Sequence, residues 1–320
     1  MLTEIITGYR KSAALNAFVK SKAPIFIGKM GAMTLDEIAC YTKTSAERFG
    51  RLLDVMIDCE ILILSEGKYS LTKNAVALAS EDSIETLWIN CELGEHYWEI
   101  WPDYFGSLGS GATRSAFEKK HGKKFFDFIT DVPSLKTTFD SLMAAITDEI
   151  SDELIKIFDI HPNHRVVDIG GGKGILAKKL KQTFSFKDCT VIDRYAKELE
   201  FSDGITYLNC DFFNQIKSGA NVYILKNILH DWDDDKAGKI LANCAHAMSK
   251  NSILYIVEII KEHGSVKGKT LDLLMDALFV GKERYYDEYE RLAFKNDLVI
   301  DSVIQTSHSQ SVLLLRKAHG

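Results

Sequence analysis

The sequence lacks the features that mark several classes of protein. Its six cysteines form no CxxC pair, so no metal site or disulfide framework is indicated, and we expect buried, reduced thiols. No stretch approaches the ~20 apolar residues that a membrane-spanning helix needs. The first residues, MLTEIITGYRKS, have no basic flank before a long apolar run, so no signal peptide is expected. These absences predict a cytoplasmic protein with no membrane partner.

An excess of basic residues is also missing. Lys and Arg number 39 against 45 Asp and Glu, and the net charge is −6. A protein that binds nucleic acid usually presents a basic face, so a nucleic-acid partner is not expected. The length of 320 residues and a hydrophobic fraction of 46% are ordinary for a globular protein and favour two domains.

The N-terminal part has the pattern of a small winged helix. Thr34 and Glu37 have the spacing of a capping box at the start of a helix, and a second helix is expected to follow from Ser45. The run ILIL, the turn SEGK and the run YSLT predict a hairpin. We therefore expect a winged-helix-like domain at 1–82. Residues 83–157 are aromatic-rich and predicted to be mostly helical.

From His164 onward, strand-like and helical runs alternate. The strand-like runs are RVVDIG, CTVID, ITYLN, NVYILKNIL, SILYIVEII, DLVIDSVIQ and SVLLLRK. Alternation of this kind predicts an α/β fold with a doubly wound parallel sheet. Only the short SHSQ segment joins the last two runs, which is too short for a parallel crossover, so that pair is predicted to be antiparallel.

A glycine-rich turn, GGGKG, directly follows the first strand of this region. Glycine tolerates positive φ and lets backbone N–H groups approach a ligand closely. Gly172, Gly174 and Ala177 also satisfy the G-x-G-x-x-A spacing of nicotinamide cofactor sites, and Asp193 follows at the distance of a ribose-binding acid. The turn alone therefore leaves two ligands open, a dinucleotide and S-adenosylmethionine, because both contain a ribose.

The segment LKNILHDW reads as a second buried strand that places His230 at its carboxyl end. In an open parallel sheet, ligands bind in the crevice outside the carboxyl ends of the strands. A histidine with an ordinary pKa of ~6.5 is half-deprotonated near neutral pH and can act as a general base. A base beside a nucleotide cradle favours an enzyme over a passive binding protein.

Four motifs taken together, DIGGGKG, VID, NCDFF and LKNILHDWDD, resemble those of S-adenosylmethionine-dependent small-molecule O-methyltransferases. The resemblance is to the plant-type and hydroxyindole-type branch, which includes many bacterial natural-product enzymes, and it spans essentially the whole chain. It implies a class I methyltransferase fold with an N-terminal dimerisation domain (1–82), followed by a helical lead-in (83–157) and a catalytic domain within 83–320. It further implies a homodimer, a phenolic acceptor on an aromatic small molecule, S-adenosylhomocysteine as product and no metal.

The same resemblance implies roles for individual residues. In this family an acid pair flanks the catalytic histidine, so His230, Glu258 and Glu283 would form the catalytic set. The cofactor would be held by residues of the turn and the following strand ends, namely Asp168, Gly170, Gly172, Gly174, Asp193, Arg194, Asp211, Phe212, Lys226, Asp231 and Trp232. The aromatic acceptor would contact Phe139, Met143, Asp231 and Met275.

One departure and three alternatives accompany this interpretation. The family usually has DLP after the second strand, whereas this chain has Asp193, Arg194 and Tyr195. Some relatives use bound S-adenosylmethionine without methyl transfer, for decarboxylation, hydroxylation or rearrangement. A nicotinamide-dependent dehydrogenase is a further alternative. A winged-helix DNA-binding regulator is the last, but the second helix offers only Arg48 and Arg51 as obvious cations.

Overall fold

The computed structural model describes residues 2–186, 188–194 and 204–318, and the chain divides into two compact units. The first unit contains the chain up to Glu99 together with Val132–Ala145. The second contains Ile100–Asp131 and the chain from Ile146 onward. Within the described ranges, no helix combines the length and apolarity needed to span a membrane.

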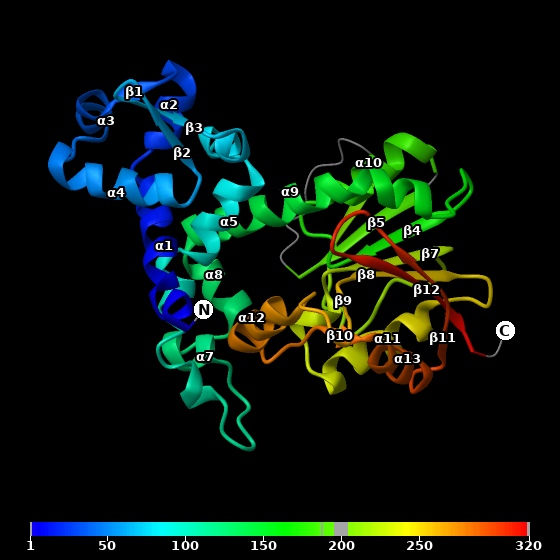
Figure 1. Cartoon of the computed structure of the whole chain (residues 1–320). Coiled ribbons are helices and arrows are strands. Elements are labelled where there is room, and N and C mark those ends of the chain that lie inside the picture. Colours follow the sequence, from blue (N-terminus) through cyan, green and yellow to red (C-terminus); the bar gives the residue numbers. More distant parts are fainter. Residues whose placement is uncertain (1, 187, 195–203, 319–320) are drawn as a thin grey trace. The chain divides into compact units, whose positions relative to one another are not determined.

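The first unit is mostly helical and carries a small antiparallel sheet in the order β1-β3-β2 (Figure 1). Its helices and strands are α1 (Leu2–Lys20), α2 (Ala23–Met30), β1 (Met33–Thr34), α3 (Leu35–Thr42), α4 (Ala46–Asp58), β2 (Leu62–Ser65), β3 (Lys68–Leu71), η1 (Lys73–Ala79), α5 (Ile84–Glu92), α6 (Glu95–Trp98) and the first part of α9 (Pro133–Ile157). The predicted pair of helices followed by a hairpin is confirmed.

Local capping explains where these helices begin. The Glu37 backbone N–H donates to the Thr34 side chain (3.3 Å), and the Thr34 backbone N–H donates to Glu37 Oε2 (2.8 Å), which confirms the predicted capping box. Ser45 caps α4 by accepting a hydrogen bond from the Arg48 N–H. The helix α4 then buries Leu53 and other apolar side chains in a core shared with α1, α2 and the hairpin.

The second unit is built on a seven-stranded sheet in the order β11-β12-β8-β7-β4-β5-β6. Its elements are η2 (Tyr104–Ser107), α7 (Ala116–His121), α8 (Phe125–Asp131), the rest of α9, β4 (Arg165–Ile169), α10 (Ile175–Phe184), β5 (Asp188–Asp193), β6 (Ile205–Asn209), β7 (Val222–Lys226), η3 (Leu229–Asp231), α11 (Asp234–Ala247), β8 (Ile253–Glu258), β9 (Ile260–Lys261), α12 (Lys269–Phe279), β10 (Arg284–Tyr285), α13 (Tyr286–Phe294), β11 (Leu298–Gln305) and β12 (Ser311–Lys317).

Helices cover both faces of this sheet, as Figure 1 shows. Side chains of α9 and α10 pack on one face, and those of α11 and α13 pack on the other. Burial on both sides explains why β4, β7 and β8 are nearly continuous apolar runs. The strand β12 runs antiparallel to β8 and β11, which confirms the predicted orientation of the last pair.

Two sequence expectations need correction. The run NVYILKNIL is not one strand: β7 ends at Lys226, because Asn227 takes a positive φ of 54° and turns the chain. His230 consequently lies on the short η3 turn beyond the strand end. All six cysteines are free, but only three are buried. Cys40, near the end of α3, is exposed, and Cys59 and Cys210 are half-buried.

Candidate active site

The glycine turn between β4 and α10 forms an open cradle. Its backbone has φ values of 71° at Gly170, 52° at Gly172 and 68° at Gly174, which side chains larger than glycine rarely adopt. A Cβ atom built on Gly172 would meet nothing within 4 Å, so this point of the turn faces open space. The Gly172 N–H donates to Asp193 Oδ2 (3.1 Å), which ties the turn to the end of β5.

Two charged side chains lie beneath this cradle. Asp168 is 2% exposed, and a Cβ atom on Gly171 would lie 2.4 Å from its Oδ2, so the turn closes directly over the carboxylate. Burial raises the pKa of Asp168 to about 7, an effect that Lys226 opposes. Burial lowers the pKa of Lys226 to about 8, against the attraction of Glu258 and Asp168. The cradle is therefore underlain by charges of both signs.

An aromatic surface follows at the end of β6. Phe212 meets Trp232 edge-on, with ring centroids 6.4 Å apart, and Phe126 of α8 stacks on Trp232, also with centroids 6.4 Å apart. The buried indole N–H of Trp232 has no hydrogen-bond partner among the described residues. Asp211 accepts hydrogen bonds from the Phe213 N–H and the Asn214 side chain, so it fixes the turn that presents Phe212. A planar ligand with a hydrogen-bond acceptor fits this surface.

Arg194, one of the two residues that depart from the family pattern, is held by α8. Its Nη2 lies 2.8 Å from Asp127 Oδ1, and both side chains are about half exposed. The contact links the end of β5 to the helix that carries Phe126. Tyr195 lies outside the described residues, and the predicted contact of Arg194 with a cofactor stays a prediction.

His230 lies among three carboxylates at the carboxyl edge of the sheet. Its Nδ1 is 2.7 Å from Glu283 Oε1 and 3.5 Å from Glu258 Oε2, whereas its Nε2 is 3.5 Å from Asp231 Oδ1. The histidine and Asp231 are each 9% exposed, and both glutamates are 0% exposed. A carboxylate at Nδ1 keeps a proton on that nitrogen, which leaves Nε2 to accept one.

Glu258 also fixes the backbone that leads to the histidine. Its Oε1 accepts hydrogen bonds from the N–H groups of Ile228 (2.9 Å) and Leu229 (2.8 Å). Its Oε2, like the Oε2 of Glu283, is buried and has no hydrogen-bond partner in the described part of the chain. Negative charge that is not compensated by hydrogen bonds therefore surrounds the imidazole.

This environment overturns the expectation of an ordinary histidine pKa. Burial alone would lower the pKa of His230, but Glu258, Glu283 and Asp231 outweigh it and raise the pKa to about 10. Burial raises the pKa of Asp231 to about 7, which the His230 charge opposes, and burial also raises the pKa of Glu258. The free site therefore holds an imidazolium at neutral pH.

Residue types that bind metals coincide with this cluster. One ligand atom from each of His230, Glu258 and Glu283 lies within 4.8 Å of the others, in the only such group that the described residues contain. The 2.7 Å separation between Nδ1 and Glu283 has the length of a charge-assisted hydrogen bond. This arrangement accounts for the orientation of the ring without a metal ligand role, and the expected absence of a metal stays a prediction.

The predicted acceptor contacts are distributed over both units. Met275 is a buried residue of α12 in the second unit. Phe139 and Met143 lie on the part of α9 that belongs to the first unit. Their convergence on one acceptor stays a prediction. Asp231 lies close to His230, and its predicted contacts with both ligands stay predictions.

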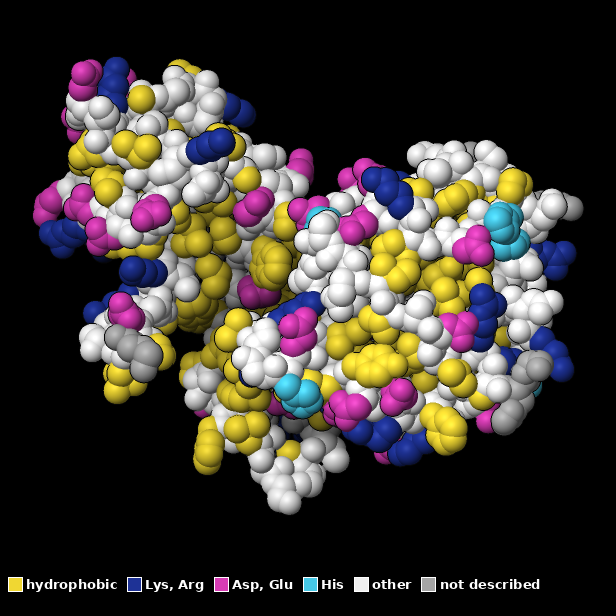
Figure 2. Space-filling view, turned by 45° about the vertical axis from the view of Figure 1, so that its right-hand side comes forward, with side chains coloured by type: hydrophobic (Ala, Val, Ile, Leu, Met, Phe, Trp, Pro, Cys, Tyr) yellow, Lys and Arg dark blue, Asp and Glu magenta, His cyan; other side chains and the backbone are white. Residues whose placement is uncertain are grey.

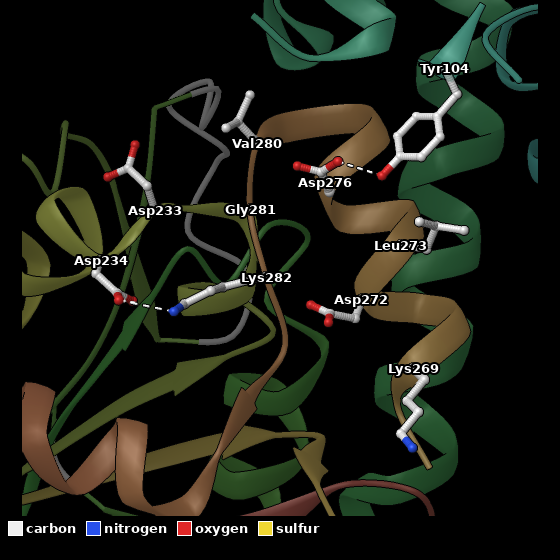
Figure 3. Close-up of a pocket in the computed structure, with 10 residues that line it drawn as sticks. All are labelled: Tyr104, Asp233, Asp234, Lys269, Asp272, Leu273, Asp276, Val280, Gly281 and Lys282. Atoms are coloured by element: carbon white, nitrogen blue, oxygen red, sulfur yellow. Dashed lines mark hydrogen bonds and ion pairs between the residues drawn. The ribbon is translucent and has the colours of Figure 1, made fainter. Parts of the chain in front are cut away.

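A polar cavity of about 520 Å³ lies between α12 and the segment that follows Trp232. Figure 3 shows two contacts among its lining residues, Lys282 directed at Asp234 (2.9 Å) and Tyr104 at Asp276 (2.6 Å). Most of the residues that line it are charged or polar, and Lys282 and Asp234 among them form an ion pair. Its remaining lining residues are Asp233, Lys269, Asp272, Leu273, Val280 and Gly281.

Three residues that support the site were missed from the sequence. Asn227 turns the chain after β7, and its Oδ1 accepts a hydrogen bond from Gln310 (2.6 Å). Asp272 of α12 accepts the backbone N–H of Glu283 (2.8 Å). Arg284 is fully buried and directed at the backbone around His230. Only Arg284 had a visible signal, since it directly follows a predicted catalytic glutamate.

Comparisons with known proteins place this geometry in context. Residues 103–297 match the O-methyltransferase domain family. The phenazine O-methyltransferase PhzM of Lysobacter antibioticus is 28% identical over 330 residues, which cover 99% of this chain and 95% of that protein. The mitomycin 7-O-methyltransferase MmcR has a similar structure, with a TM-score of 0.89, 25% identity and coverage of 99% and 97%. NcsB1, from neocarzinostatin biosynthesis, has the same fold (TM-score 0.81, 24% identity, coverage 96% and 95%). It was solved with S-adenosylmethionine and 2-hydroxy-5-methyl naphthoic acid.

The carboxylates around His230 lead to a prediction about the pKa of this residue in the ligand-free protein. The His230 imidazole is expected to stay protonated through neutral pH, with a pKa of about 10. The Glu283→Gln substitution removes a neighbouring negative charge and is expected to lower that pKa. Titration of ¹⁵N-labelled histidines by NMR measures both values, with His230→Gln identifying the resonance. An unshifted pKa of ~6.5 in the unsubstituted protein would contradict the proposed electrostatics.

Proposed function

Because this chain belongs to the O-methyltransferase domain family, we propose that it transfers a methyl group from S-adenosylmethionine to a phenolic hydroxyl of an aromatic small molecule, with His230 as general base. The observation that carries the proposal is the 2.7 Å contact between His230 Nδ1 and the buried Glu283, which leaves Nε2 as the proton acceptor. This base stands at the same sheet edge as the glycine cradle.

The residues of the cradle suit S-adenosylmethionine. Asp193 can accept hydrogen bonds from ribose hydroxyls, and the Trp232–Phe212 surface suits an adenine. The positive φ angles and open space at the glycine turn admit the amino-acid part, with Lys226 and Asp168 beneath it. When bound, S-adenosylmethionine supplies an electrophilic methyl group. NcsB1, which has the same fold, binds this molecule, and that supports the assignment.

The carboxylates make His230 a base that matches a phenol. A phenol has a pKa near ~10, so transfer of its proton to an ordinary imidazole is uphill by about 5 kcal/mol. With the pKa of His230 raised to about 10, the transfer becomes nearly balanced. The price is that the ring, protonated at neutral pH, must first lose its own proton before it can accept that of the phenol. Glu283 then holds the ring in position as the proton arrives at Nε2.

An aromatic acceptor is favoured by the relatives and by the residue types at the site. PhzM is named for a phenazine, and NcsB1 was solved with a naphthoic acid. We propose that Phe139, Met143 and Met275 contact the acceptor ring, since methionine adapts well to aromatic surfaces. Asp231 is proposed to contact both cofactor and acceptor, and Arg194 to contact the cofactor.

A homodimer formed through the winged-helix-like domain at 1–82 is also proposed. Leu2, Ile5, Ile6 and Tyr9 on α1 are 69%, 71%, 61% and 57% exposed, and their spacing places them on one helix face. Figure 2 displays hydrophobic side chains among the charged ones on the protein surface. A continuous apolar face of this kind is typical of a protein–protein contact.

Loss of the base tests the reaction directly. The His230→Ala variant is expected to bind S-adenosylmethionine with unchanged affinity while its kcat falls by roughly 10²–10⁴-fold. His246→Ala, which removes an exposed histidine of α11, is the matched control. Release of S-adenosylhomocysteine in step with methylated product is the assay. If a product accumulates while S-adenosylmethionine stays intact, the result would contradict methyl transfer and indicate a non-methylating reaction.

The pH profile tests the role of Glu283. Because the His230 pKa is raised, kcat/KM for a weakly acidic phenol is expected to increase with pH above neutrality. Glu283→Gln should lower that pKa, so the rising limb moves to lower pH while the maximal rate falls because the base is weaker. A variant whose limb stays in place would show that Glu283 does not tune the base.

Alanine substitutions at two glycines distinguish a specific loss of cofactor binding from the general effect of backbone strain. Gly172 and Gly219 both have positive φ (52° and 82°), and a Cβ atom on either would meet nothing within 4 Å. Alanine at each is expected to destabilise the fold by about 1 kcal/mol. Only Gly172→Ala should weaken S-adenosylhomocysteine binding in calorimetry, as should Asp193→Ala. If the two glycine variants bound S-adenosylhomocysteine with equal affinity, the glycine turn would not be part of the binding site.

The dimer is tested by charge on the apolar face of α1. The Ile5→Glu/Ile6→Glu variant should elute as a monomer in size-exclusion chromatography with light scattering, because buried carboxylates are costly at an apolar contact. Lys11→Glu, on the opposite face of the same helix, should leave the dimer intact. A monomeric unsubstituted protein would refute the assembly.

A further inference from the structure

Backbone carbonyls of the segment that carries the base are held by one neighbouring segment. Arg284 Nη1 donates to the carbonyl of Leu229 (2.8 Å), and its Nη2 donates to that of Trp232 (2.8 Å). Between them, the carbonyl of His230 accepts the backbone N–H of Lys282 (2.8 Å). Three of the four carbonyls from Leu229 to Trp232 are thus bound by residues 282–284.

We call this set of hydrogen bonds, from residues 282–284 to the carbonyls of Leu229, His230 and Trp232, the clamp. Arg284 is 0% exposed, and its Nε donates to Asp234 Oδ1 (2.9 Å), so its buried charge is both paired and hydrogen-bonded. Its backbone is anchored because β10 pairs with β9, with Arg284 opposite Ile260. A Cβ atom on Gly281 would lie 2.2 Å from the His230 carbonyl oxygen, so the two segments are in direct contact.

We propose that Arg284 is a positioning residue that sets His230 and Trp232 together from a single guanidinium. Glu283 orients the imidazole ring through Nδ1, and the adjacent Arg284 fixes the backbone on which that ring is mounted. The positions of the His230 imidazole and the Trp232 indole are therefore both set by the same guanidinium. This inference rests on the proposed role of His230 in methyl transfer.

Guanidinium chemistry explains why arginine suits this position. The two carbonyls at 229 and 232 and the carboxylate of Asp234 need three separate donors in a fixed plane. A lysine ammonium at the same place carries the charge but is a point donor on a flexible stem. Arg284→Lys therefore removes the geometry of the clamp while it preserves the charge.

The first experiment follows the ligand-free protein by ¹⁹F NMR after incorporation of 5-fluorotryptophan. The chain has four tryptophans, and Trp232→Phe identifies the relevant resonance. Arg284→Lys is expected to shift or broaden the Trp232 signal and to leave those of Trp88, Trp98 and Trp101 in place. No cofactor or turnover is involved, so this result is independent of whether methyl transfer is the correct reaction.

The second experiment measures methyl transfer. Arg284→Lys is expected to lower kcat by about 100-fold, since a displacement of ~1 Å at a reacting group has that effect, with little change in the acceptor KM. Added guanidinium ion should partly restore the rate of Arg284→Ala, but not that of His230→Ala. A structural role alone predicts a loss of folded protein instead of this split and rescue.

Two further variants keep the proposal testable if the buried arginine cannot be replaced. Gly281→Ala pushes on the His230 carbonyl from the pocket side and should lower kcat and shift the Trp232 resonance. Gly238→Ala in α11, where the nearest atom to a new Cβ lies 3.5 Å away, is the matched control. Asp234→Ala, at a half-exposed carboxylate, removes the charge partner of Arg284 and should act in the same direction.

The outcomes separate the two proposals. Wild-type kcat and an unmoved Trp232 resonance in folded Arg284→Lys, Gly281→Ala or Asp234→Ala would overturn the clamp. If the clamp is overturned but His230→Ala is inactive, the proposal of methyl transfer is unaffected. A Trp232 resonance that shifts in Arg284→Lys, together with an unsubstituted protein that makes no methylated product, would support the clamp and refute the proposed function.

Discussion

The site depends on a buried imidazolium that compensates carboxylates the fold could not otherwise enclose. Glu258 and Glu283 are fully buried, and each has an oxygen without a hydrogen-bond partner among the described residues. Two such groups would repel each other strongly in a medium of low polarity. The His230 ring lies against both and carries the opposite charge, so the three groups stabilise one another. The same balance that makes the cluster tolerable also makes the histidine strongly basic.

Sheet topology brings these charges together from distant parts of the chain. Glu258 ends β8, and His230 follows the end of the neighbouring strand β7, where Lys226 pairs with Val257. Glu283 arrives from a separate segment, whose backbone N–H is held by Asp272 of α12. A shift of one residue in the pairing of β7 with β8 would reverse the faces of one strand's side chains relative to those of the other. Continuous apolar strands buried on both sides are therefore a condition of the chemistry as well as of stability.

Patterns local in sequence predicted much of this arrangement. The Thr34 capping box, the hairpin and the antiparallel last strands follow from spacing alone, and the glycine turn is recognisable because it directly follows a buried strand. What escaped prediction depends on contacts between distant residues. The end of β7 at Lys226 results from the conformation of Asn227, and the raised pKa of His230 results from carboxylates 28 and 53 positions away. The position of Arg284 beside Glu283 was a signal, but its role escaped prediction, since two of its partners are backbone carbonyls that no side-chain pattern reveals.

The basicity of His230 also limits which acceptors can benefit from it. A carboxylic acid, with a pKa near ~4, is already ionised at neutral pH and needs no base. A hydroxyl as weakly acidic as water, which has a pKa of 15.7, would stay almost wholly protonated even beside a base with a pKa of about 10. A phenol lies between these limits, because its pKa near ~10 matches that of the buried imidazole. The carboxylate cluster therefore acts on acceptor choice through acidity, independently of the shape of the cavity that receives the ring.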